Sequence, residues 1–279
     1  MSHALRITKG EFGRVALLDM DRSLVRHAHP HCHVLLKIDG DDTQFAVGDR
    51  VAPLTDTLAV LINAWETHAY VHDPARRNSL ILALYIEPRW LCAFRPNWVA
   101  SATPGFFDSA TGVVDARIQN LSRDLVAEMI HAPEPSAAKE ILLSDLMIAV
   151  IDRFTPWRSV GGSLWDRART ATIDRRIRRA IGAMRADPAN GASMAQIAKS
   201  AGLSRAHFFR MFERSTGVTP HVFLNVLKVE CAVNQVAASD ASLTLIGADL
   251  GFGSPAHFSR FFRDHVSVAP SEFRAVLRF

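Results

Sequence analysis

The sequence Ala206-His207-Phe208 returns fifty residues later as Ala256-His257-Phe258. Each copy follows a turn of small residues, at 201–204 and at 250–254. The further matched pairs are Arg210 and Arg260, Phe212 and Phe262, Val218 and Val268, Pro220 and Pro270, and Phe223 and Phe273. A short helix, a glycine turn and a longer helix with basic outer side chains is the pattern of a helix-turn-helix unit. Two units could enter successive major grooves, roughly 34 Å apart, so DNA recognition is the first hypothesis.

Charge is distributed unevenly along the 279 residues. Residues 161–279 carry 16 Lys and Arg against 9 Asp and Glu, whereas residues 1–160 carry 16 against 19. The positive excess therefore lies in the part that holds the repeat, where DNA phosphates would have to be neutralised. Taken alone, this excess is also explained by an ordinary solvated surface.

Composition indicates a folded protein of the reducing cytoplasm. With 48% hydrophobic and 22% charged residues, disordered, collagen-like and coiled-coil chains are excluded. No apolar run approaches the ~20 residues that span a bilayer, and the N-terminus lacks the pattern of a signal peptide. Cys32, Cys92 and Cys231 form no disulfide framework. We therefore expect a cytoplasmic protein without a membrane partner.

The first part of the chain is predicted to form short antiparallel strands, followed by a helical hairpin. Apolar periods of three and four residues begin near 113 and continue to 152, with a break at 132–136. We expect this hairpin also to form a dimer interface, through the row Ile118, Leu121 and Leu125. The alternative is that its apolar rows only cover the chain's own sheet. The predicted strands are Gly13–Leu18, His27–Ile38, Thr43–Val47, Leu58–Asn63, His68–His72 and Ser79–Ile86.

After a linker without periodicity, every segment has a helical pattern. Gly247 interrupts one short predicted helix at a cost of about 1 kcal/mol relative to Ala, and close helix packing is the expected reason. The predicted helices run from Thr172 or Asp174 to Arg185, then over 194–200, 204–215, 220–238, 243–250 and 254–265.

Residues 173–279 resemble the AraC/XylS family of bacterial transcription regulators. The resemblance implies a seven-helix bundle with one helix-turn-helix unit at each end of a long helix, binding to asymmetric promoter sites, and contact with RNA polymerase. Two departures are Ser267, where the family commonly has glycine, and Ala206, where it often has a larger side chain. The residues that carry the resemblance are Ile197-Ala198, Gly202-Leu203-Ser204, Phe208, Arg210, Phe212, Gly217, Thr219-Pro220, Ile246, Gly251-Phe252, His257-Phe258-Ser259-Arg260, Phe261-Phe262-Arg263 and Pro270-Ser271-Glu272-Phe273-Arg274.

Helical geometry divides the two recognition helices into a core face and a DNA face. Phe208, Met211, Phe212, Phe258, Phe261 and Phe262 are expected in the core. Arg205, Ala206, Phe209 and Arg210 are expected to face DNA, as are Pro255, Ala256, His257 and Arg260. An Arg can bind guanine O6 and N7 with two hydrogen bonds. Contact with phosphate, or an ion pair with a nearby acid, is the alternative role for Arg210 and Arg260, and His207 and His257 could equally cap or pack.

The N-terminal half resembles the cupin-like effector domain of many AraC-type regulators. His27-Ala28-His29, His33, Gly40 and His68 follow the cupin order of HxH, Glu, Gly and His, with His33 in place of Glu. Alternation along a strand would put His27, His29, His31 and His33 on one face.

Three readings of this cluster stay open. It could hold a divalent transition metal, since imidazoles suit such ions, through His27, His29, His33 and His68. It could bind an organic effector through His29, His33, His68 and Trp65, with Glu66 and Tyr70 as further walls. It could also hold no ligand. Without metal, it is expected to titrate near neutral pH.

Together these patterns predict an α+β protein with two domains. Residues 1–155 form a cupin-like antiparallel β-barrel with a helical hairpin, 156–170 a linker, and 171–279 an all-α domain with two helix-turn-helix units. The expected function is that of an effector-controlled transcription regulator that acts as a homodimer on promoter DNA. Activation is its expected output, as the family resemblance implies. A metal-responsive regulator is the alternative. A metal-dependent cupin enzyme is the rival class, which the tandem repeat disfavours.

Overall fold

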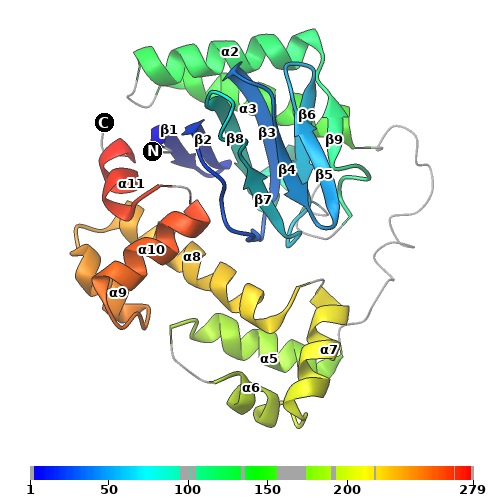
Figure 1. The fold of residues 1–279 in the computed structure, drawn as a ribbon, viewed down its shortest axis with the longest axis vertical. Helices are drawn as coiled ribbons and strands as arrows, with labels where there is room; N and C mark the ends of the chain where they lie inside the picture. The colour runs from blue at the N-terminus through cyan, green and yellow to red at the C-terminus, as the bar shows by residue number, and fades with distance from the viewer. Residues whose placement is uncertain are drawn as a thin grey trace. The chain divides into compact units, whose positions relative to one another are not determined.

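The computed structural model describes residues 3–94, 101, 105–132, 136–155, 174–189, 193–216, 218–266 and 268–277 (Figure 1). The chain forms two compact units, one comprising Met1–Pro156 with Arg263–Phe279 and the other Trp157–Phe262. The domain limits inferred above stay predictions. The linker at 156–170, the alternative cap Thr172, and both Gly217 and Ser267 lie outside the described residues.

Two antiparallel sheets form the framework of the first unit. One has the strand order β1-β2-β8-β3-β6-β9 and the other the order β5-β4-β7. The antiparallel strands predicted from the sequence are thus present, while closure into a cupin barrel stays a prediction. The strands are β1 (His3–Gly10), β2 (Gly13–Met20), β3 (Cys32–Gly40), β4 (Thr43–Val47), β5 (Arg50–Leu54), β6 (Leu58–Ile62), β7 (His68–Val71), β8 (Ser79–Ile86) and β9 (Thr111–Val113).

The middle of the larger sheet is covered on both faces. Every residue from Ile81 to Ile86 in β8 is buried, as are residues 14–18 of β2. Consecutive buried residues on a strand require packing on both sides, because successive side chains point to opposite faces. The polar side chains that do occur in these strands are therefore enclosed.

The helical hairpin predicted at 113–152 is confirmed as α2 (Ala116–His131) and α3 (Ala137–Phe154). Asp115 and Ser136 accept hydrogen bonds from backbone N–H groups in the first turns, which explains where the helices begin. Ile118 and Leu125 are buried and Leu121 is half-buried. Ile118 and Leu125 therefore pack within the chain, and the dimer contact expected through this row stays a prediction.

Three strands and two helices lie outside the ranges predicted from the sequence: β1, β5, β9, α1 (Pro88–Phe94) and α11 (Pro270–Leu277). Strand β5 contains Pro53, which argues against a central strand, and β5 indeed lies at the edge of its sheet. The strand predicted from His27 begins instead at Cys32, after Pro30. His27 alone makes an isolated bridge, to His68.

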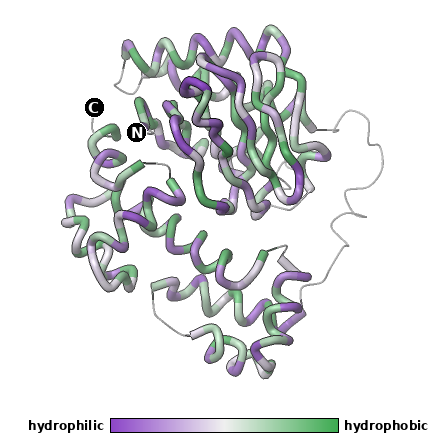
Figure 2. Tube along the Cα trace, in the orientation of Figure 1, coloured by the Kyte–Doolittle hydropathy of each residue, from purple (hydrophilic) through white to green (hydrophobic). Residues whose placement is uncertain are grey.

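The C-terminal region is helical, with bounds close to those predicted. Asp174, Ser193, Thr219 and Ser242 each cap a helix by accepting a backbone N–H, so the starts were readable from the sequence. Figure 2 shows hydrophobic and hydrophilic residues interspersed along these helices. The helices are α5 (Arg175–Ala186), α6 (Met194–Ser200), α7 (Arg205–Thr216), α8 (Pro220–Ala238), α9 (Leu243–Asp249), α10 (Pro255–Val266) and α11 (Pro270–Leu277).

No helix in the described ranges is both long and apolar enough to cross a membrane.

Candidate DNA-binding and effector sites

The turns of the two sequence repeats have the same backbone geometry. Gly202 and Gly251 have φ of 71° and 76°, a left-handed conformation that glycine adopts without steric cost. Each glycine N–H donates to the carbonyl three residues earlier, in Lys199 and in Ala248. The next N–H, of Leu203 or Phe252, donates to the carbonyl five residues earlier. The repeat seen in the sequence is therefore also a repeat in conformation.

The longer helix of each repeat also begins in the same way. Ser204 Oγ accepts from His207 N over 3.3 Å, and Ser254 Oγ accepts from His257 N over 3.2 Å. The second turn contains one extra residue, Gly253, so the spacing between the copies changes from 49 to 50 residues there. Despite this insertion, α7 and α10 present equivalent residues after their caps.

The core faces of α7 and α10 are marked by four phenylalanines that are 0% exposed, Phe208, Phe212, Phe258 and Phe262. The residues expected to face DNA are exposed, with one exception: they are Arg205, Ala206, Arg210, Pro255, Ala256, His257 and Arg260. The exception is Phe209, which is half-buried with its ring centroid 5.4 Å from that of His221. The Phe209 side chain is thus partly packed against the rest of the protein.

Two residues expected in the core, Met211 and Phe261, are only half-buried. Each precedes a fully buried phenylalanine by one position, which turns it about 100° away from the centre of the apolar face. Phe261 packs at the margin against Phe252, with ring centroids 4.8 Å apart. Both residues therefore border the core.

The close packing expected at Gly247 is confirmed. A Cβ atom at this position would lie 3.0 Å from Phe258 Cβ and 3.1 Å from Phe258 Cγ. The absence of a side chain thus lets α9 approach the buried face of α10. The glycine helps to set the position of the helix that carries Arg260.

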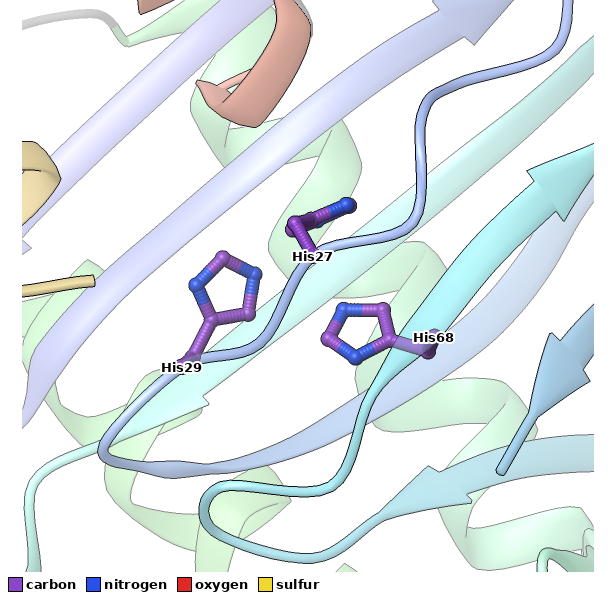
Figure 3. Close-up of side chains that lie close together, drawn as sticks. All are labelled: His27, His29 and His68. Atoms are coloured by element: carbon purple, nitrogen blue, oxygen red, sulfur yellow. The ribbon is translucent and has the colours of Figure 1, made fainter. Parts of the chain in front are cut away.

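A cluster of buried histidines lies in the first unit (Figure 3). His27 and His29 come from the segment before β3, and His68 is the first residue of β7. One ring nitrogen from each lies within 4.8 Å of the others. The ring centroids of His27 and His68 are 4.4 Å apart, and those of His29 and His68 are 5.0 Å apart. All three are at least 94% buried.

Backbone carbonyls orient two of these rings. His27 Nδ1 lies 2.8 Å from Val25 O, and His68 Nδ1 lies 2.9 Å from Glu66 O. Since a carbonyl only accepts, Nδ1 carries the hydrogen in both rings and Nε2 keeps its lone pair. The Nε2 atoms of His29 and His68 and both ring nitrogens of His33 are buried without a hydrogen-bond partner.

His33 belongs to a row of three side chains across the larger sheet. Arg14 on β2 and His33 on β3 are both register partners of Tyr85 on β8. The His33 ring stacks on Tyr85 with centroids 4.0 Å apart, and the Arg14 guanidinium lies 3.8 Å from the centre of the Tyr85 ring. Arg14 is 7% exposed, and no carboxylate in the described ranges forms an ion pair with it.

Sequence reasoning missed Arg14. The available signal was a single cation in the apolar run Val15–Leu18 and its flanks, which is unusual for a buried strand. A buried guanidinium that stacks on an aromatic ring keeps its N–H groups as donors for an anion.

Burial lowers the pKa of His27, His29 and His33 well below the ordinary value of 6.5, and neighbouring imidazoles lower it further. Burial also lowers the pKa of His68, to about 4. The cluster is therefore neutral at pH 7. The expectation that it titrates near neutral pH without metal was wrong, because desolvation disfavours the charged imidazolium.

Other residues predicted near the cluster have different roles. His31 is not part of the histidine cluster, and its Nε2 lies 3.2 Å from Glu87 Oε2. Tyr70 packs on Phe45, and Glu66 Oε2 accepts from the backbone and side chain of Asn63.

Trp65 is tied to the cluster through its backbone, since its N–H donates to His29 O over 2.6 Å. Its φ is 66°, uncommon for a bulky residue. Strained backbone of this kind concentrates at functional sites.

Comparison with known proteins finds similarity to transcription regulators. Residues 173–275 match the model of a helix-turn-helix domain of the AraC type. An uncharacterized HTH-type transcriptional regulator of Haemophilus influenzae is 32% identical over 104 residues, which are 37% of this chain and 35% of that protein. The probable transcriptional regulator LumQ of Photobacterium leiognathi is 19% identical over 259 residues, covering 93% of this chain and 95% of LumQ. The C-terminal region is therefore a helix-turn-helix domain of the AraC type.

Two further similarities extend beyond the C-terminal region. The transcriptional activator RhaS of Citrobacter koseri is 30% identical over 157 residues, 54% of this chain and 52% of RhaS. The structure of unsaturated fatty acid-bound ToxT from Vibrio cholerae has a TM-score of 0.54 at 11% identity, and covers 99% of this chain and 97% of ToxT. At that identity the similarity concerns the fold.

Proposed function

We propose that this protein is a transcription regulator of the AraC family that binds promoter DNA through α7 and α10, under the control of a small anionic effector bound near His33. The observation that carries the proposal is the repeated turn: two equivalent helices each present an exposed arginine, Arg210 and Arg260, above a phenylalanine core. A helix held in this way by a preceding helix and turn is the standard reader of the major groove.

The roles proposed for individual residues follow from their exposure. Arg210 and Arg260 read base edges, while Arg205, Ala206, His257, Pro255 and Ala256 lie at the DNA surface. Phe209 contributes through packing, because it is half-buried against His221. The positive excess of residues 161–279 supplies the general attraction to phosphate.

The effector is proposed to be an anion because of what surrounds His33. Arg14 is a buried cation without a carboxylate partner in the described ranges, and four buried imidazole nitrogens of His29, His33 and His68 lack hydrogen-bond partners. Buried polar groups need partners, and a carboxylate would accept hydrogen bonds from a guanidinium. The fatty acid bound by ToxT carries such a group. Trp65, linked to His29, is proposed to border this site.

The remaining partners are proposed from the similarity to AraC-type regulators. A homodimer acting on a promoter in the cytoplasm and contact with RNA polymerase are part of the proposal, and activation is its expected output because the relative RhaS is an activator.

DNA recognition is tested by selecting binding sites for the full-length chain from a random duplex pool and placing them before a reporter gene. We expect an enriched sequence, an affinity that falls steeply with salt, and altered reporter transcription when the chain is present. A pool that converges on no sequence would refute sequence-specific binding.

Effector binding is tested separately, with oleate and acetate as the probes. We expect a carboxylate probe to raise the melting temperature of the full-length chain, and Arg14→Gln to remove the effect. Arg22→Gln is the matched control, since Arg22 is exposed and pairs with Asp21. An equal response in the Arg14 variant would place the anion elsewhere, and no response to either probe would count against a monocarboxylate effector.

A further inference from the structure

We propose that the imidazoles of His27, His29 and His68 bind one divalent transition-metal ion, of the class of Zn²⁺, Ni²⁺ or Co²⁺. The inference deepens the proposed function, because the ion would lie in the proposed effector site. Its role in regulation rests on that function, whereas its binding rests only on the geometry of the three side chains.

The three imidazoles lie close enough together to share one ion. One nitrogen from each imidazole lies within 4.8 Å of the other two. An ion at about 2.1 Å from each nitrogen holds them at most about 4 Å apart. Rotation of the rings about their two side-chain torsions can supply this contraction. The backbone between His27 and His68 need not move, since the two residues already form a bridge.

Two of the rings are already oriented as metal ligands. The carbonyls of Val25 and Glu66 occupy Nδ1 of His27 and His68, which leaves Nε2 as the electron-pair donor. Ligating histidines usually have this arrangement, because a hydrogen bond at the other nitrogen sets the tautomer and raises the basicity of the ligand.

Without a ligand, the buried imidazoles destabilise the folded protein. The buried Nε2 atoms of His29 and His68 make no hydrogen bond. Leaving such atoms unsatisfied in a site from which water is excluded costs free energy. A metal ion satisfies both lone pairs at once, and neutral imidazoles accept it without first losing a proton.

The donor set indicates the class of ion. Three neutral nitrogens and no carboxylate favour borderline transition metals, whereas Mg²⁺ and Ca²⁺ require oxygen ligands. His33 lies beside the set, its ring 5.5 Å from His29 and 5.6 Å from His68. Arg14 adds positive charge to the surroundings, so an anionic effector would offset the charge of the ion.

The test uses full-length protein stripped with chelator and titrated with Co²⁺, whose visible absorption reports its ligands. We expect one ion per chain, with metal content checked independently by mass spectrometry. Loss of a partner that merely orients a ligand weakens binding up to about 100-fold, so His27→Ala, His29→Ala and His68→Ala should each weaken it at least that much. His131→Ala is the control and should bind like the parent, because His131 is exposed at the end of α2.

A second variant keeps the test decisive if an alanine variant fails to fold. His29→Cys retains a ligand but replaces nitrogen with sulfur, and should add a sulfur-to-cobalt charge-transfer band in the near ultraviolet. Absence of Co²⁺, Ni²⁺ and Zn²⁺ binding by the parent chain would overturn the inference. So would binding that survives in the folded alanine variants, or a His29→Cys spectrum without the new band. The proposed DNA recognition is judged separately, by affinity for the selected sites with and without metal.

Discussion

His27 and His68 lie opposite each other in an isolated antiparallel bridge, with His27 N donating to His68 O over 2.9 Å and His68 N donating to His27 O over 2.8 Å. The bridge joins the segment before β3 to the start of β7 and holds the two imidazoles 4.4 Å apart. Their proximity is therefore set by backbone hydrogen bonds. This bridge would preorganise the proposed metal site.

The histidine cluster should make the stability of the metal-free protein depend on pH. The pKa of His68 is 6.5 when unfolded and about 4 when folded, so its full contribution is present above pH 6.5 and is lost as pH falls toward 4. From His68 alone, we expect the free energy of unfolding to drop by about 2 kcal/mol between pH 7 and pH 5. His27, His29 and His33 act in the same direction.

Urea unfolding followed by tryptophan fluorescence measures this effect, because Trp65 and Trp90 lie in the first unit. His68→Gln should flatten the dependence. An unfolding free energy that is the same at both pH values would show that the imidazoles are solvated.

The local features of this fold could be predicted from the sequence. Helix starts were marked by Ser193, Thr219 and Ser242, and strands β4 and β8 by apolar runs between turns. These signals act within a few residues, so no knowledge of tertiary structure is needed to interpret them.

The composition of the proposed effector site was only partly predictable. The order of His27, His29, His33 and His68 suggested a cluster, and the structure brings them together. The row Arg14, Tyr85 and His33 depends instead on the register of three strands that are distant in the sequence. Register follows from packing of the whole sheet, so no local pattern contained this row. The bend after Pro30, which turns His31 toward Glu87, was likewise set by tertiary contacts.

Arg210→Ala and Arg260→Ala should each weaken binding to the selected DNA site more than binding to a scrambled duplex. If each arginine reads a guanine, the loss on the selected site is about 1–3 kcal/mol. Fluorescence anisotropy on both duplexes measures it. Arg123→Ala, an exposed change on α2, is the control and should alter neither affinity. Equal losses on both duplexes would show that the arginines contact phosphate only.

The dimer proposed for the hairpin should depend on its exposed apolar residues. Ile141 on α3 is 61% exposed, whereas Ile118 and Leu125 on α2 are buried. We expect Ile141→Asp to produce a folded monomer, measured by light scattering after size exclusion. Val51→Asp is the matched control, since Val51 is 67% exposed on the edge strand β5. A dimer that persists in the Ile141 variant would place the interface elsewhere.

Two helical glycines offer a matched test of how α10 is positioned. Gly182 in α5 is exposed, and a Cβ there would meet nothing within 4 Å. Gly182→Ala should therefore stabilise the protein by up to about 1 kcal/mol, the difference in helix propensity. Gly247→Ala gains the same propensity but places its Cβ 3.0 Å from that of Phe258.

Because Phe258 is fully buried, the Gly247→Ala clash can be relieved only by moving α9 or α10. We expect a net destabilisation of about 1–3 kcal/mol, as for other overpacked cores. Affinity for the selected DNA site should also fall, since α10 carries Arg260. Urea unfolding followed by circular dichroism and anisotropy on the selected duplex measure the two effects. If Gly247→Ala were as stable and bound as tightly as Gly182→Ala, the close approach of α9 would not be what positions the second recognition helix.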